Sequence, residues 1–425
     1  MRDMLKKVLK RILPEKAVVS LRRIRATLRQ LRDALIVRYH YIRLSVLRVF
    51  RNRPTSDGAA LHHQPRSGVR VQTRVTASAL KNAPNRTKPH VLFVTEKWCD
   101  CNPAMGATNS EHNLFGSLEA SGLATYNRFH FDEHYYLHNG ASDAALLALC
   151  MESKPDLLFF TWCGDHYSPK WATLDLLRRK MGIPLIAMWW EVTGQPELAL
   201  PFLDLNVVVH SKCLERARQP EKYLLMWTPQ DPRVYYNPNM NRDIGISFVG
   251  SIKNPHYSDR RAGTAALRSN GIEVYQSGGQ RECRLLVDEY ARIHMRSKIA
   301  LNFGLGTGGV QHAKGRIFEA TLCGAMLLDA ENSETSRWFE PMVDYVPFVD
   351  EMDLVEKARY YLEHDSGREE IAARGHQKAK EKYSAERFWR GIFAKVFGSG
   401  PRPGGAYIER TLLDIPFSLD DVERG

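Results

Sequence analysis

Short apolar runs alternate with segments of helical character along most of the chain, and this alternation limits the possible fold more than any other feature. Runs with so little polar alternation are typical of strands that are covered on both faces. Strands that alternate with helices predict an α/β fold built on doubly wound parallel sheets. The predicted strands are residues 90–95, 156–161, 184–189, 205–209, 244–249, 272–275, 298–303, 325–328 and 346–349. The predicted helices are residues 109–121, 170–181, 259–269, 285–296, 353–363, 367–382 and 384–396, with a further helix that begins near 314.

A turn-rich stretch at 228–238, with three prolines and one asparagine, divides this alternation into two series. A single hydrophobic core stops growing at roughly 250–300 residues, so a chain of 425 residues has room for two. We predict an N-terminal Rossmann-like domain at 89–240 and a C-terminal Rossmann-like domain at 241–397, followed by a tail at 398–425. Two such domains that face each other predict a cleft between them.

The positive charge of the chain is concentrated before the first predicted strand. Residues 1–53 hold 16 Lys and Arg and three Asp and Glu, whereas the rest of the chain holds 44 basic and 45 acidic residues. Leucines and isoleucines recur there at helical intervals among the arginines, which predicts a basic amphipathic helical extension. Residues 54–88 are rich in Pro, Gly, Ser and Thr and predict a flexible linker.

The basic extension suits the surface of an anionic membrane, where each nearby cation contributes about 1 kcal/mol. Packing on the protein itself or pairing as a coiled coil remains an alternative, and nucleic-acid binding is a third. The near-neutral remainder of the chain argues against a nucleic-acid binder. No apolar stretch of about 18 residues occurs, and the first residues lack the apolar core of a signal peptide.

Seven cysteines are scattered without a regular framework, which indicates reduced thiols. Cys99 and Cys101 lack a second pair of Cys or His at metal-ligand spacing, so we predict no metal site. We therefore expect a cytoplasmic protein, which could also lie at the inner face of the membrane through residues 1–53.

The segment 314–329 places one acid and two cations beside an apolar run. Lys314, Arg316 and Glu319 precede the run Ala-Met-Leu-Leu, which predicts a helix that leads into a buried strand. Ala320 and Gly324 are small residues, so a ligand or a strand can approach this side of the helix closely. Near a helix start, the Glu319 carboxylate can accept two hydrogen bonds from a ribose diol. Its alternative role is to complement the helix dipole.

The same residues carry a family resemblance. Glu319-Ala320, followed by Cys323-Gly324 and the apolar strand, resembles the Glu-Ala-x-x-x-Gly signature of group 1 GT-B glycosyltransferases. The preceding Lys-x-Arg-x-Phe is similar to the narrower CgeB-like, spore-maturation branch. The resemblance runs from about residue 244 to 383, with a looser match back to 88. It implies a hexosyl- or related transferase that moves a sugar from a nucleotide-sugar donor to a glycan, lipid-linked or protein acceptor. It also implies that protein cations and helix ends replace a metal, and that no cofactor is needed besides the nucleotide sugar.

Several residues are candidates to hold the donor besides Glu319. Arg316 and Lys314 can bind the diphosphate, and Lys314 is also a catalytic candidate because charge develops on that leaving group. Gly308 and Gly309, in a glycine-rich stretch, could let backbone amides approach the phosphates. An alternative for the two cations is a solvated surface pair.

Two positions depart from the resembling family. Gly250 and Ser251 follow the first strand of the second domain, where group 1 enzymes often carry a glycine and a basic residue. The available cations there are Lys253, Arg260 and Arg261. Gln311 stands eight residues before Glu319, where many retaining members have an acid. Gln311 can hydrogen-bond a sugar hydroxyl, yet the stereochemical outcome stays open.

On the acceptor side, His112 and Glu191 are the candidates to orient or deprotonate a hydroxyl. His112 could equally be a surface or capping histidine. Other polar residues that we consider are Asp100, Asn109, Glu111, His210 and Ser211. Two other functions share this fold: a nucleotide-sugar epimerase, and a non-catalytic nucleotide-sugar-binding or scaffold protein. Gln311 favours the second of these.

Overall fold

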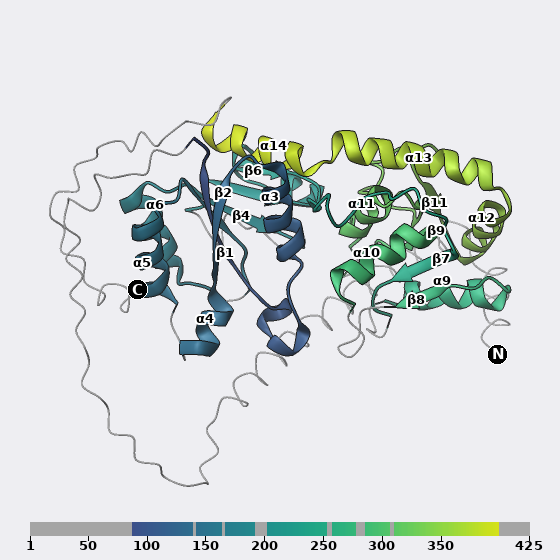
Figure 1. Ribbon diagram of the computed structural model, residues 1–425, viewed down its shortest axis with the longest axis horizontal. Coiled ribbons are helices and arrows are strands. Elements are labelled where there is room, and N and C mark those ends of the chain that lie inside the picture. Colours follow the sequence, from purple (N-terminus) through teal and green to yellow (C-terminus); the bar gives the residue numbers. More distant parts are fainter. Residues whose placement is uncertain are drawn as a thin grey trace, which may run out of the picture. The chain divides into compact units, whose positions relative to one another are not determined.

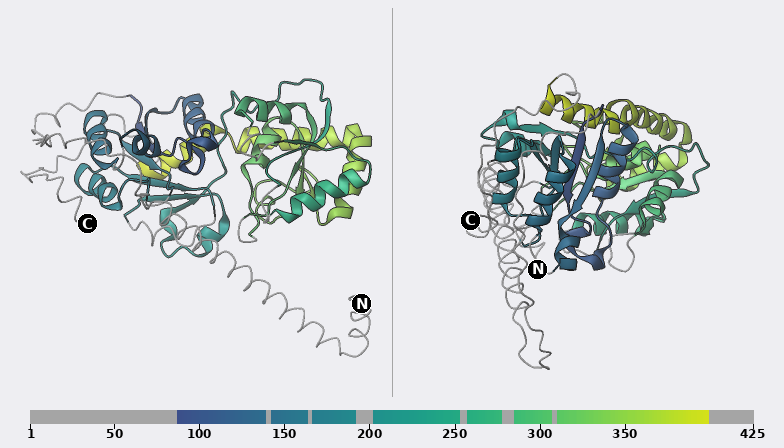
Figure 2. Two further views of the ribbon diagram at one scale, coloured as in Figure 1. Left: turned by 90° about the horizontal axis from the view of Figure 1, so that it is seen from below. Right: turned by 60° about the vertical axis from the view of Figure 1, so that its left-hand side comes forward.

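The computed structural model describes residues 87–138, 142–163, 166–191, 202–252, 257–277, 285–306 and 310–398. The predicted extension at 1–53 lies outside the described residues, as do nearly all of the linker at 54–88 and of the tail at 398–425. The described residues form two sheets of parallel strands with helices on both faces, as the sequence predicts for an α/β fold (Figures 1 and 2).

The first sheet has the strand order β2-β1-β3-β4-β5-β6, and every neighbouring pair is parallel. In β1, Val91 and Phe93 pack into one hydrophobic cluster, while Leu92 and Val94 pack into another. Successive side chains of a strand point to opposite faces, so these two clusters are the two faces of the sheet. The strands are β1 (His90–Thr95), β2 (Thr125–His130), β3 (Leu157–Phe160), β4 (Leu185–Trp189), β5 (Leu205–Val208) and β6 (Tyr223–Leu225). The helices are α3 (Ser117–Ser121), α4 (Phe131–His138), α5 (Asp143–Ser153), α6 (Trp171–Met181) and α8 (Ser211–Glu215).

The second sheet has the order β11-β10-β9-β7-β8, again parallel throughout. Leu301 and Leu328 face one cluster, and Ala300 and Leu327 face the other. The strands are β7 (Ile244–Val249), β8 (Tyr275–Ser277), β9 (Ser297–Asn302), β10 (Met326–Ala330) and β11 (Val346–Phe348). The helices that follow β6 in the chain are α9 (Ser258–Ser269), α10 (Val287–Arg296), α11 (Gly315–Leu322), α12 (Glu351–Glu363), α13 (Asp365–Lys382) and α14 (Ala385–Phe397).

The last helix differs from its predicted place. We included residues 384–396 in the second domain, yet α14 packs on the first sheet. Phe388 and Trp389 share a cluster with Phe93, and the Trp389 indole donates to Ser117 Oγ at 2.9 Å. The chain therefore returns to the first sheet after completing the second, because the apolar stripe of α14 covers a face of strands β1 and β3.

Several elements around the first sheet were missed or misjudged, among them the helices α4, α5 and α8, which were not predicted. β2 is an edge strand whose residues are mostly half-exposed, so Thr125–His130 lacks an apolar run. β6 has only three residues. The predicted helix at 109–121 is split into a π-helical turn, Glu111–Gly116, and the short α3. In the second sheet β8 begins at Tyr275, where the predicted strand 272–275 ends.

Candidate functional site

The strand order of the second sheet reverses at β7, which has β8 on one side and β9 on the other. In open parallel sheets, ligands bind beyond the carboxyl ends of the strands at such a reversal. Gly250 and Ser251 directly follow β7, and Asn302 ends β9. This edge therefore positions the residues of the candidate site.

Arg316, in the first turn of α11, lies across this reversal point. Its Nη1 donates to Asn302 Oδ1 at 2.8 Å. Its Nη2 lies 2.6 Å from the point where a Cβ would stand on Gly250. Its guanidinium also lies over the ring of Phe248, 5.1 Å from the centroid. A side chain at position 250 would displace this guanidinium, so the glycine is needed for the approach of Arg316.

Behind Arg316, a chain of buried polar groups holds Asn302 in place. The Asn302 amide donates to Asp329 Oδ1 at 2.8 Å, and the Thr335 hydroxyl donates to Asp329 Oδ2 at 2.7 Å. Burial raises the pKa of Asp329 to about 6, and these two hydrogen bonds hold the rise in check. Asn302, Asp329 and Thr335 are all fully buried, so this chain fixes the direction of Arg316 rather than contacting a ligand.

Arg260, on α9, is a second cation at the same edge and, unlike the partly exposed Arg316, it is buried. Its Nη1 donates to the carbonyl of Ser251 at 2.9 Å, and its guanidinium lies 3.5 Å from the ring centroid of Tyr257. Burial, together with the positive charge of Arg316, lowers the pKa of Arg260 to about 10.

The two arginines share an unusual state. The Nε of Arg260 and the Nε of Arg316 are buried and have no hydrogen-bond partner among the described residues. Within the same residues, neither guanidinium has a carboxylate at ion-pair distance. The polar partners of Arg260 are the Ser251 carbonyl and the Tyr257 hydroxyl, and those of Arg316 are the Asn302 amide oxygen and the Tyr290 hydroxyl. Withdrawing a guanidinium from water without a paired carboxylate is costly, and guanidinium groups match phosphate geometry. This pair is therefore suited to an anion at the end of β7.

Glu319 is the fifth residue of α11 and not close to its N-cap, which is Lys314. This corrects the predicted position at the helix start and weakens the alternative role as a partner of the helix dipole. Glu319 is buried, and its Oε2 accepts from the Tyr290 hydroxyl at 2.6 Å. Burial raises the pKa of Glu319, while the bond to Tyr290 and the charge of Arg316 oppose the rise.

Lys314 and Glu191 come together although they belong to different sheets. Glu191 lies just beyond β4, and its Oε1 is 3.7 Å from Lys314 Nζ. Its Oε2 is 3.4 Å from Nε2 of His312. Burial lowers the pKa of Lys314, and burial with the charge of Lys314 lowers the pKa of His312 to about 3. His312 is therefore neutral near pH 7.

A second polar group joins the end of β5 to loops of the second domain. The carbonyl of Gln311 accepts from His210 Nε2 at 2.8 Å, because His210 Nδ1 is already the acceptor for the backbone amide of Lys212. The Glu334 carboxylate accepts from both the backbone amide, at 2.9 Å, and the hydroxyl of Ser211. These bonds hold the loop that carries Gln311 against β5.

The remaining predicted site residues lie elsewhere. His112 is half-buried on the π-helical turn, where burial lowers its pKa and the charges of Asp231 and Asp288 oppose the shift. Gly308 and Gly309 lie outside the described residues. The predicted roles of all these residues, as catalytic or donor-binding groups, stay predictions.

Sequence reasoning missed Tyr290, His312 and the pair Asn302 and Asp329. The last two had a usable signal, since each is a polar residue at the carboxyl end of an apolar strand. Tyr290 and His312 had none, because only tertiary packing brings them to Glu319 and Glu191. No cluster of three or more metal-ligating side chains occurs in the part of the chain that the structure describes.

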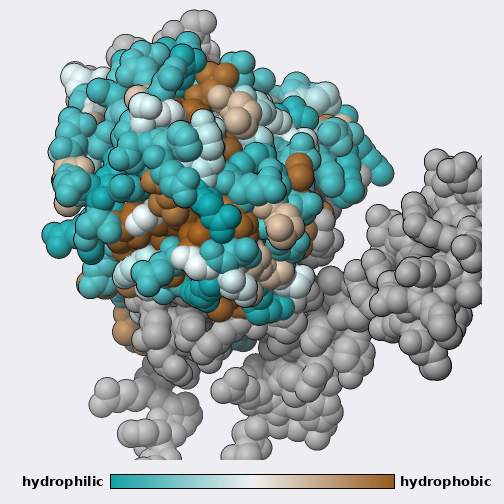
Figure 3. Space-filling model, turned by 90° about the vertical axis from the view of Figure 1, so that its right-hand side faces the viewer, coloured by the Kyte–Doolittle hydropathy of each residue, from teal (hydrophilic) through white to brown (hydrophobic). Residues whose placement is uncertain are grey.

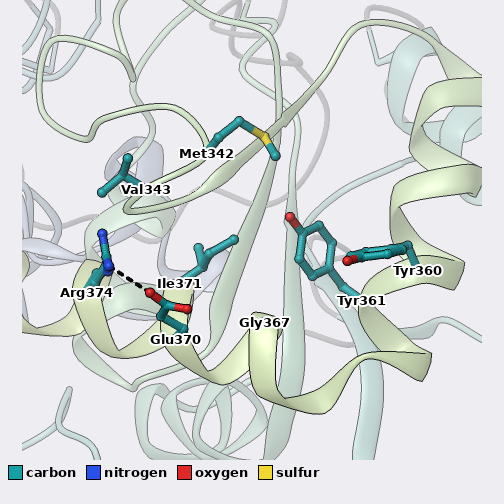
Figure 4. Close-up of a pocket in the computed structure, with 8 residues that line it drawn as sticks. All are labelled: Met342, Val343, Tyr360, Tyr361, Gly367, Glu370, Ile371 and Arg374. Atoms are coloured by element: carbon teal, nitrogen blue, oxygen red, sulfur yellow. Dashed lines mark hydrogen bonds and ion pairs between the residues drawn. The ribbon is translucent and has the colours of Figure 1, made fainter.

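A pocket on the second domain lies apart from this edge, between α12, α13 and the turn before β11 (Figure 4). Met342, Tyr360 and Tyr361 line it, and an ion pair of Arg374 with Glu370 stands at its side. Figure 3 shows hydrophobic side chains gathered on this side of the domain among hydrophilic ones. None of the residues that line the pocket contacts the arginine pair, and we assign it no role.

Comparisons with known proteins agree with this geometry. Residues 253–394 match a family model described as glycosyl transferase-like. No curated protein matches the chain in sequence. One similar solved structure is Alr3699/HepE of Anabaena in complex with UDP-glucose, with 12% identity and a TM-score of 0.52 over 73% of this chain and 100% of that one. Another is an α-glucosyltransferase in complex with UDP-glucose and DNA containing an abasic site, with 7% identity and a TM-score of 0.50 over 73% and 100%. The two parallel sheets thus have the GT-B fold of glycosyltransferases, and the second of them carries the glycosyl transferase-like match.

Proposed function

We propose that this protein is a glycosyltransferase that takes its sugar from a nucleotide-sugar donor, with UDP-sugars as the first candidates. The observation that carries the proposal is the pair of Arg260, which is buried, and Arg316, which is partly buried. Neither has a carboxylate at ion-pair distance among the described residues, each has a buried Nε without a hydrogen-bond partner there, and both stand at the strand reversal of the second sheet. The glycosyl transferase-like match over 253–394 supports it, as do the UDP-glucose complexes of two proteins of the same fold.

The chemistry follows from where charge develops. Departure of a nucleoside diphosphate places negative charge on its β-phosphate, and preorganised donors there are the largest catalytic contribution to be expected. Arg260 and Arg316 supply two such donors, and Lys314 a third cation. Glu319, held by Tyr290, remains our candidate for the ribose hydroxyls. The proposal includes transfer without a metal, because protein cations take its usual place.

The first test measures nucleoside diphosphate release from UDP-, GDP-, ADP- and dTDP-sugars, in the intact chain and in Glu319→Ala. We expect release from one donor class, with at least a 100-fold weaker response in Glu319→Ala because a ribose contact and the partner of Tyr290 are both lost. Glu386→Ala, an exposed residue of α14, is the control and should match the intact chain.

The outcomes separate the alternatives. Donor that changes configuration without an acceptor would indicate an epimerase. Donor binding by calorimetry without release would favour a non-catalytic binding or scaffold protein, the alternative that Gln311 supports. If no donor binds at all, the glycosyltransferase proposal is wrong.

The acceptor and the location belong to the same proposal. We infer a glycan, lipid-linked or protein acceptor. From the basic amphipathic pattern of residues 1–53 we also infer contact of this segment with an anionic membrane. None of the helices that the structure describes is long and apolar enough to cross a bilayer. Co-sedimentation with phosphatidylserine vesicles should fall by more than tenfold when 1–53 is deleted, and should fall steeply with salt. Unchanged co-sedimentation would remove the membrane from the proposal.

A further inference from the structure

Glu191 combines two properties that rarely occur together in one side chain. Two groups lie beside its carboxylate: Oε2 is 3.4 Å from Nε2 of the neutral His312, and Oε1 is 3.7 Å from Lys314 Nζ. The Glu191 side chain is nevertheless 60% exposed, whereas those of His312 and Lys314 are 5% and 23% exposed. A substrate can therefore reach this carboxylate without displacing the groups that orient it.

The loop that presents His312 and Lys314 is itself well held. Its Gln311 carbonyl accepts from His210, and its His312 carbonyl accepts from the Asn332 amide, both at 2.8 Å. The backbone at Gly306 lies against the other side, where a Cβ would be 2.8 Å from His312 Nε2 and 3.2 Å from Lys314 Nζ. The two groups that hold Glu191 thus have little freedom to move.

This loop is also where the chain departs from the family that it resembles. Position 311 is Gln, which cannot serve as a carboxylate. Lys314, three residues further along the loop, is within ion-pair distance of Glu191. Glu191, at the end of β4, therefore places a carboxylate beside the loop that lacks one. Lys314 is the N-cap of α11 and Arg316 lies in its first turn, and the charges of Arg260 and Arg316 both act on Lys314. Glu191, beside Lys314, therefore lies near the predicted diphosphate site.

We propose that Glu191 is the catalytic base of the transfer described above, an inference that rests on the proposed glycosyltransferase function. Its carboxylate takes the proton of the acceptor hydroxyl while the hydroxyl oxygen forms a bond to the anomeric carbon of the donor. The bond from that carbon to the diphosphate oxygen breaks, and its electron pair leaves with the diphosphate. His312 and Lys314 are positioning residues for the base. A single displacement of this kind inverts the anomeric carbon.

The test compares Glu191→Gln with the intact chain, using the donor found in the panel and UDP, or the matching nucleoside diphosphate, as the binding probe. We expect kcat for transfer to fall by about 10²–10⁴-fold, the usual contribution of a general base. The dissociation constant of the nucleoside diphosphate should stay within twofold, and the acid limb of the pH profile of kcat/KM should disappear. Nuclear magnetic resonance of the product should show inversion. Glu386→Gln is the matched control and should leave every value unchanged.

Three results would overturn the inference. A Glu191→Gln variant with kcat within fivefold of the intact chain would make Glu191 only a partner of Lys314. A loss of nucleoside diphosphate affinity as large as the loss of kcat would make it a donor-binding residue. A product of retained configuration would exclude a base in a single displacement. If the intact chain releases no nucleoside diphosphate, the proposed function itself is wrong, and this inference falls with it. If the intact chain releases nucleoside diphosphate and Glu191→Gln is equally active, only the role of Glu191 as the base is wrong.

Discussion

Replacing Arg316 by glutamine is expected to lower kcat/KM for nucleotide-sugar turnover by about 10²–10³-fold, which is the effect of removing one preorganised donor from a developing anion. Arg316 is aimed by Asn302 and lies against Gly250, so no flexible side chain nearby can replace it. Arg316→Lys keeps the charge but loses the planar, two-pronged guanidinium, so its activity should lie between those of the intact chain and Arg316→Gln. Steady-state kinetics with the preferred donor and calorimetry with the nucleoside diphosphate measure both effects.

The control for this variant is Arg374→Gln, which removes an exposed guanidinium from the same domain; among the described residues its ion-pair partner is Glu370. Its kinetics should equal those of the intact chain. If Arg316→Gln is folded and keeps kcat/KM within fivefold, the guanidinium serves mainly to cover Phe248, and the anion site is elsewhere. If instead affinity for the nucleoside diphosphate falls while kcat is kept, Arg316 binds the ground state and does not favour the transition state.

Arg242→Met is expected to destabilise the second domain by about 2–4 kcal/mol, since a carbonyl left without its charged donor costs about 1–3 kcal/mol and water can reach part of this site. Its Nη1 donates to the carbonyls of His294, Met295 and Ser297 at 3.2, 2.7 and 3.0 Å. Its Nη2 donates to the carbonyl of Cys323 at 2.9 Å. One guanidinium thus ties the end of α10 to the end of α11. Equilibrium denaturation in urea, followed by circular dichroism, measures the loss.

Arg296→Met provides the matched comparison for Arg242, because it removes a guanidinium at the end of α10 whose partner, Asp243, is exposed on the surface. An exposed ion pair contributes little to stability because water screens it, so this variant should stay close to the intact chain. Equal stability of the two variants would show that water satisfies the carbonyls when Arg242 is absent. Since α10 carries Tyr290 and α11 carries Glu319, we also expect Arg242→Met to weaken donor binding.

The structure explains the glycine of the Glu-Ala-x-x-x-Gly segment. Gly324 has a φ of 75°, in the left-handed region that ends helices, and a Cβ on it would stand 2.8 Å from Arg242 Nη2. Gly324 is therefore needed for two reasons: it ends the helix, and it lets a distant arginine approach closely. Only the first of these could be inferred from local pattern, because Arg242 is 82 positions away along the chain.

Most of the fold follows from local pattern. A strand that is buried on both faces must be apolar along its length, so β1, β3, β4, β7 and β9 were recognisable from the residues alone. The half-exposed edge strand β2 has no such requirement and was missed. The cations of α11 were likewise visible as a cluster, since Lys314 and Arg316 are neighbours in the chain.

Long-range packing decided the rest. Trp389 reaches Ser117 across 272 positions, which assigns α14 to the first sheet. Arg260 meets Arg316 because the carboxyl ends of the parallel strands of the second sheet gather at one edge. Glu191 meets Lys314 because the end of β4, in the first sheet, lies against the loop before α11. Periodicity reports which face of one element is buried. It carries no information on which distant element covers that face. For this chain, the contact of the proposed base, Glu191, with Lys314 and the approach of Arg260 to Arg316 both depend on that long-range packing.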